Sequence, residues 1–186
     1  MSTDTLRHGA LSMAALALTS LLATAPALRA VPPATSPTES SSAVPHLPSA
    51  DEARQQADVL HEALHAALQV VHHEYYREDE GLAIPAATLK KVFRELETRR
   101  RIKLRWLAVD AKAMNSDHLP QDAFERDAVA ALAAGKKSHE VVGAGVYRHA
   151  GPITLTSECL KCHLPNRTSN QDRVAGLVVE IPIAPK

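Results

Sequence analysis

Apolar residues spaced three and four positions apart predict a long first helix over residues 51–76. Ser49 and Glu52 stand three residues apart, as in a capping box, so the helix is expected to begin beside them. Its apolar stripe consists of Leu60, Leu64, Leu68, Val71 and Tyr75. A stripe confined to one side indicates that this helix packs its apolar face against a core.

Two shorter helices are predicted further along the chain. Pro85 suits the first turn of a second helix, and the basic run at 99–101 suits its C-terminal end. A third helix is predicted over residues 121–134, where Gly135 is placed to end it.

Residues 102–109 alternate between apolar and basic side chains, which predicts a half-buried strand. Further strand-like stretches occur at 140–142, 146–155 and 174–183, with a glycine-containing turn between the first two. Helices therefore gather early in the chain and strands late. This order predicts an α+β fold with a largely antiparallel sheet.

The N-terminal residues have the pattern of an export signal. Arg7 and His8 precede an uncharged apolar run from 11 to 25, which is shorter than the roughly 20 residues of a membrane-spanning helix. Residues 1–30 are therefore predicted to be a signal peptide, with an uncleaved N-terminal anchor as the alternative. Residues 31–48 are rich in Pro and Ser and are predicted to form a disordered linker, so the folded domain spans 49–186.

Composition narrows the range of partners. Lys and Arg number 21, as do Asp and Glu, so the formal net charge is +0. This balance gives no electrostatic reason to expect binding to nucleic acid or to a charged membrane surface. The two cysteines are too few for a multi-disulfide scaffold, so their position in the sequence decides their chemistry.

Both cysteines belong to the segment Cys159-Leu160-Lys161-Cys162-His163, which has the C-x-x-C-H spacing of covalent haem attachment. Two thiols three residues apart can add to the two vinyl groups of one porphyrin, and His163 then becomes the proximal iron ligand. The spacing predicts one covalent haem c. A redox dithiol and a zinc site are the alternatives, and the predicted export favours haem, because c-type haem is attached outside the cytoplasm.

Three segments together resemble a known family. They are the stretch 146–153, which contains Arg148 and a later Pro-Ile pair, the motif at 159–163, and the apolar strand at 174–182. They resemble the periplasmic single-haem c-type domain with a PAS-like fold, the Tll-type c-haem domain. The resemblance implies an antiparallel sheet of about five strands flanked by N-terminal helices. Some members supply a cysteine from the N-terminal helical region as second axial ligand, whereas this chain has no third cysteine.

The second axial ligand must therefore be another kind of side chain, or be absent. His61, His65 and His72 fall within about 40° on one face of the first helix, by the helical period. We predict His72 as the distal ligand and His65 as the second candidate, because His72 lies beside apolar positions expected to be buried. The competing interpretation is that these are half-exposed helix histidines, and Met114 is a further candidate through its thioether.

Two arginines are candidate partners of the haem propionates. Arg148 and Arg105 lie on predicted strands, and guanidinium groups bind carboxylates in a bidentate manner. The alternative is that both are ordinary surface charges of strands. Trp106 is expected in the core.

These features predict an exported, periplasmic monohaem c-type protein that acts in electron transfer or redox sensing with a redox partner protein. The alternative is a diatomic-gas sensor or a peroxidase-like enzyme with an open sixth coordination site. An enzyme would also require distal acid-base groups, which the sequence does not reveal, so the non-enzymatic function is favoured.

Overall fold

The computed structural model describes residues 46–143 and 145–185. The predicted signal peptide and nearly all of the predicted linker lie outside the described residues. The helices are α1 (Ala50–Glu74), η1 (Glu78–Glu80), α2 (Pro85–Arg100), η2 (Ser116–His118), α3 (Ala123–Ala133) and α4 (Leu160–His163). The strands are β1 (Lys103–Ala108), β2 (His139–Gly143), β3 (Val146–Leu155) and β4 (Arg173–Pro182).

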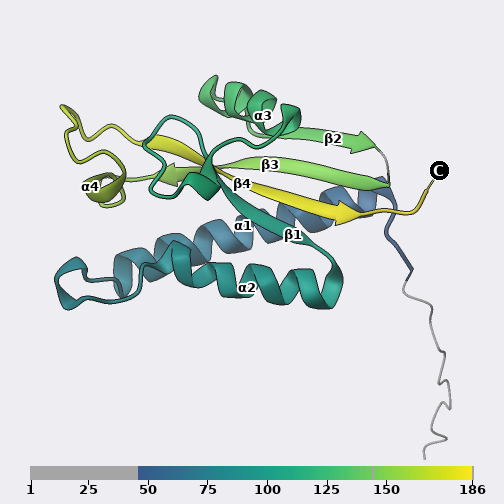
Figure 1. The fold of residues 1–186 in the computed structure, drawn as a ribbon, viewed down its shortest axis with the longest axis horizontal. Helices are drawn as coiled ribbons and strands as arrows, with labels where there is room; N and C mark the ends of the chain where they lie inside the picture. The colour runs from purple at the N-terminus through teal and green to yellow at the C-terminus, as the bar shows by residue number, and fades with distance from the viewer. Residues whose placement is uncertain (1–45, 144, 186) are drawn as a thin grey trace, which may run out of the picture. The chain divides into compact units, whose positions relative to one another are not determined.

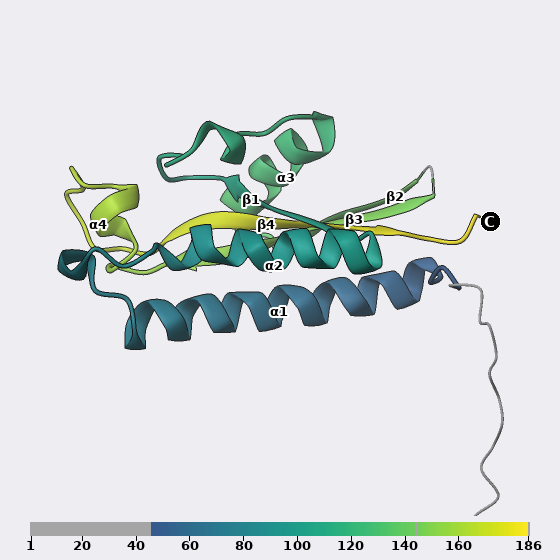
Figure 2. The ribbon, with the colours of Figure 1, turned by 60° about the horizontal axis from the view of Figure 1, so that its bottom comes forward.

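The four strands form one antiparallel sheet in the order β1-β4-β3-β2. Helices α1 and α2 cover one face of this sheet, and α3 covers the other (Figures 1 and 2). The short α4 lies beyond the ends of β3 and β4, in the connection between them (Figure 1). The predicted α+β class is confirmed, although the described sheet has four strands where the family resemblance implied about five.

Helix α1 begins at the predicted capping box. The Ser49 side chain accepts a hydrogen bond from the Glu52 amide, and the Glu52 carboxylate accepts one from the Ser49 amide at 2.8 Å. The buried positions of α1 are Ala53, Ala57, Leu64 and Leu68. The reciprocal cap therefore fixes the start of a helix whose inner face is apolar for its first five turns.

The predicted apolar stripe is wrong at its C-terminal end. Val71 is 41% exposed and Tyr75 is 71% exposed. Instead of apolar side chains packed in the core, His72 in the last turn of α1 and Tyr76, just beyond the helix, line a cavity. The spacing of apolar residues by three and four positions thus continues beyond the part of the helix that packs on the sheet.

The two faces of the sheet carry separate apolar clusters. On the side of α1 and α2, the Trp106 indole donates a hydrogen bond to the Ala86 carbonyl at 2.9 Å and its ring lies 4.9 Å from that of Phe93. This confirms Trp106 as a core residue, only 6% exposed. The cluster on the side of α3 contains Leu107, Phe124, Ala128, Leu132, Ala150 and Val178.

Side chains of α1 cover part of the edge of β3. Strand β2 pairs with β3 only as far as Ala150, so within the described part of the chain the later residues of β3 have no strand on that side. There the imidazole Nε2 of His61 lies 3.0 Å from the Pro152 carbonyl. Both backbone groups of Thr154 are also hydrogen-bonded. Its N–H donates to Nε2 of His65 at 3.3 Å, and its carbonyl accepts from Nε2 of Gln69 at 2.7 Å. These three bonds satisfy backbone groups that would otherwise form an open strand edge.

Gly151 allows α1 to approach β3 this closely. A Cβ atom at this position would lie 2.6 Å from the His61 imidazole. We expect Gly151→Ala to displace that ring and to lower the free energy of unfolding by about 1–3 kcal/mol. The control is Gly143→Ala, because a Cβ there meets no atom within 4 Å. Urea denaturation of both variants tests this, and equal stability of the two would contradict the role given to Gly151.

Candidate haem site

Helix α4 places the C-x-x-C-H segment in the loop between β3 and β4. Leu160 anchors it, since its side chain is fully buried and its carbonyl accepts a hydrogen bond from Arg167 at 3.1 Å. Cys159 and Cys162 are half-buried and no disulfide joins them. Both thiols are therefore held at the surface of the domain by a short helix with one buried residue.

His163 is held from one side by the segment that follows β1. Its backbone carbonyl accepts a hydrogen bond from the Lys112 amide at 3.2 Å, and its imidazole Nδ1 lies 3.4 Å from the Lys112 carbonyl. Burial lowers the pKa of His163, the Lys112 carbonyl opposes this, and His72 lowers it further. The ring is therefore neutral near pH 7 with the Nδ1 proton toward Lys112, which makes Nε2 the atom available to a metal.

A cavity of about 730 Å³ adjoins these three residues. This volume lies within the usual range of roughly 300–1,000 Å³ for sites that bind cofactors and small ligands. The lining includes Cys159, Cys162 and His163 together with side chains from α1, α2 and the segment after β1. Its apolar wall is formed by Leu68, Ala86, Trp106, Leu107, Ile153 and Leu155. An apolar wall beside two thiols and a neutral imidazole fits a haem.

The two predicted distal ligands occupy different environments. His72 lines the cavity, and its ring centroid lies 5.0 Å from that of Tyr76. His65 does not line it, because its imidazole accepts the Thr154 amide at the edge of β3. Burial lowers the pKa of His65, as does the neighbouring His61, which keeps the ring neutral as that acceptor. The prediction of His65 as the second candidate is thus corrected, because its side chain binds the edge of β3 instead.

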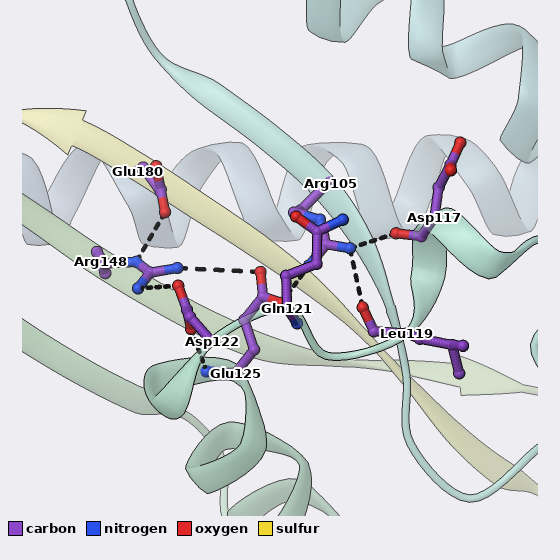
Figure 3. Close-up of polar contacts among 8 residues, drawn as sticks. All are labelled: Arg105, Asp117, Leu119, Gln121, Asp122, Glu125, Arg148 and Glu180. Carbon is purple, nitrogen blue, oxygen red and sulfur yellow. Dashed lines mark hydrogen bonds and ion pairs between the residues drawn. The ribbon is translucent and has the colours of Figure 1, made fainter.

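The two predicted propionate partners are also corrected. Neither Arg105 nor Arg148 lines the cavity, since both lie on the face of the sheet that α3 covers. Arg148 forms ion pairs of 2.7 Å with both Asp122 and Glu180, and Arg105 pairs with Glu125 (Figure 3). Alternation along β1 explains this arrangement, because Trp106 faces the α1 side and its neighbour Arg105 must face the other.

The cavity lining includes polar residues that sequence reasoning did not single out. Basic side chains are supplied by Arg77, Lys90, Lys112 and Lys161, and an imidazole by His118. They come from four separate segments and follow no shared spacing, so no pattern in the sequence groups them. Met114, predicted as a further ligand candidate, also lines the cavity and is 52% exposed.

The zinc alternative lacks a suitable ligand set. Within residues 46–143 and 145–185, no group of three or more His, Cys, Asp or Glu side chains is arranged to hold a metal ion. The cysteines and His163 face a large apolar cavity instead.

No helix in the same described ranges is long and apolar enough to cross a membrane.

The fold and the site define an α+β domain with a C-x-x-C-H helix at the edge of a cofactor-sized cavity. The family model of the Tll0287-like proteins matches residues 46–177, more than half of the chain, so the chain belongs to that family. A search among curated proteins finds no match.

Among solved structures, the chain is similar to the cyanobacterial heme-protein Tll0287. The TM-score is 0.55 at 16% sequence identity, and the match covers 73% of this chain and 98% of the other. A likeness at this identity establishes the fold, which is the PAS-like arrangement that the family resemblance implied.

Proposed function

We propose that this chain is a monohaem c-type protein, exported to the periplasm, that acts in electron transfer or redox sensing. The observation that carries the proposal is the position of Cys159, Cys162 and His163 at a cavity of about 730 Å³, with His163 already held through Nδ1. Membership of the Tll0287-like family and the solved structure of the heme-protein Tll0287 support it. When bound, the haem supplies one-electron chemistry at its iron.

Each residue of the motif has a defined task in this proposal. The thiols of Cys159 and Cys162 would hold the porphyrin, each by adding across one vinyl group, with the sulfur on one carbon and the thiol hydrogen on the other. This addition would need no oxidant. His163 would offer Nε2 to the iron while the Lys112 carbonyl fixes the ring, as hydrogen-bond partners of metal-bound histidines commonly do.

Two lysine side chains are the proposed partners of the haem propionates, in place of Arg105 and Arg148. Lys90 and Lys112 line the cavity and carry the positive charge that two propionates require. Lys90 also lies 3.8 Å from Asp117 and is about one-third exposed, so this ion pair is weak and can exchange for a propionate.

His72 is proposed as the distal ligand. It lines the cavity from α1, whereas His163 is held from the segment after β1 and lines the same cavity. Met114 is less suitable, because it lies two residues from Lys112, the residue that supports the proximal histidine. Two imidazoles would saturate the iron, which favours electron transfer over gas binding or peroxidase chemistry.

The export signal and the partner remain predictions from the sequence. Covalent haem attachment takes place outside the cytoplasm, so an export signal at 1–30 agrees with the proposed cofactor. The proposed partner is a redox protein that exchanges electrons with the haem.

Haem staining tests the proposal. The full chain is produced in a bacterial host with c-type maturation machinery, and a denaturing gel is stained for haem peroxidase activity. We expect a stained band for the wild type and none for the Cys159→Ala, Cys162→Ala double variant. An unstained wild-type band beside a stained control cytochrome from the same cells would overturn the haem assignment.

A further inference from the structure

The segment between β1 and α3 forms one wall of the cavity. The residues of this segment that line the cavity include Ala111, Lys112, Ala113, Met114, Asn115 and His118. Its regular structure is limited to the single turn of η2 at Ser116–His118. A wall with so little hydrogen-bonded structure needs other contacts to keep its position.

Arg105 supplies such contacts from the neighbouring strand. Its Nη2 group donates hydrogen bonds to the carbonyl oxygens of Asp117 and Leu119, the second at 3.1 Å (Figure 3). These carbonyls belong to the residues on either side of His118. One guanidinium group on β1 therefore holds the backbone on both sides of a residue that lines the cavity.

A buried carboxylate fixes the guanidinium in turn. Glu125 is 2% exposed and pairs with Nη1 of Arg105. It also accepts the backbone amide of Gln121 at 2.7 Å (Figure 3). Removing one partner would leave the buried charge of Glu125 uncompensated, so breaking this ion pair is costly. Glu125 thus binds the wall directly at Gln121, and through Arg105 it also holds the carbonyls of Asp117 and Leu119.

His118 lies between the two residues whose carbonyls Arg105 binds, and it lines the cavity. Its Nε2 atom is buried and has no hydrogen-bond partner among the described residues. Buried polar atoms are normally satisfied, so the backbone contacts made by Arg105 stabilise a position that this nitrogen does not itself stabilise.

We propose that Arg105, fixed by Glu125, is a positioning residue that holds the 110–121 wall and thereby sets the place of His118 and Met114 at the cavity. This inference rests on the proposed function only where it concerns haem. Arg105 does not line the cavity itself, so it acts through the backbone of Asp117 and Leu119.

Arg148 offers a matched control. The side chains of Arg105 and Arg148 are 24% and 20% exposed, and both pair with Glu125. The other ion-pair partners of Arg148 are Asp122, the N-cap residue of α3, and Glu180 on β4. Arg105→Gln and Arg148→Gln thus remove similar charges from one cluster, but only the first removes donors to the wall.

Hydrogen exchange of the full-length protein tests the positioning role. We expect Arg105→Gln to speed amide exchange in residues 115–121 by about tenfold or more relative to α1 amides, as for loss of hydrogen bonds to a charged group. Arg148→Gln should leave that ratio within about twofold of wild type. Equal acceleration in both variants, or none in either, would overturn the proposal, and Arg105→Lys is the substitute if Arg105→Gln does not fold.

The same preparations test the consequence for haem. We expect the reduction potential and the visible spectrum to change in the Arg105 variant and to match wild type in the Arg148 variant. Faster exchange with an unchanged potential and spectrum would overturn the link from the wall to the haem. A protein without haem would refute the proposed function, while the exchange ratio still decides the role of Arg105.

Discussion

Alanine in place of His72 is expected to convert a low-spin, six-coordinate haem protein into a high-spin form that binds carbon monoxide. The reason is that His72 lines the cavity from α1, while His163 is supported by Lys112 of the segment after β1. Removing the distal imidazole leaves the sixth position of the iron open. Electron paramagnetic resonance of the oxidised protein and carbon monoxide difference spectra of the reduced protein measure this change, which should be close to complete.

His65→Ala is the control for this experiment. His65 lies on the same helix, two turns before His72, but binds the backbone of β3 and does not line the cavity. We expect this variant to lose stability and to keep the low-spin spectrum. A low-spin spectrum in the His72 variant would assign the sixth position to another side chain. A wild type that is already high-spin would favour gas binding or peroxidase chemistry.

Replacing Leu160 by alanine is expected to have the largest effect on stability. Leu160 is fully buried although it lies in the C-x-x-C-H segment, directly after Cys159. Substitution of a buried leucine by alanine costs about 2–5 kcal/mol, because transfer free energy is lost and a cavity remains. We expect the free energy of unfolding to fall by that amount in urea denaturation, and the spacing of the two thiols to become less fixed.

Leu164→Ala is the matched comparison. Leu164 is one turn further along and only half-buried, so its loss should cost less than half as much. The Leu160 variant should also show a lower yield of covalently attached haem at the growth temperature. Equal destabilisation by the two substitutions would contradict the anchoring role of Leu160.

Local patterns in the sequence determined the elements of the fold. The capping box at Ser49 and Glu52 set the start of α1, and the predicted strand at 146–155 coincides with β3. These features depend on residues close together in the chain, through reciprocal hydrogen bonds and a two-residue alternation. The C-x-x-C-H spacing is local for the same reason, because two thiols on one short segment must reach one porphyrin. The haem assignment therefore needed no tertiary structure.

Tertiary structure decided which side chains meet. His65 and His72 lie on one helix, but α1 passes from the edge of β3 to the cavity between them, so only His72 lines the cavity. Arg105 and Arg148 have the chemistry for binding propionates, but their positions on β1 and β3 direct both to the face of the sheet that α3 covers, where the buried carboxylate of Glu125 pairs with them. A charge that close to a guanidinium outweighs the preference for any more distant partner. The sequence does not show which of these side chains lie far from the cavity, because the packing of α1 and α3 on the sheet decides this.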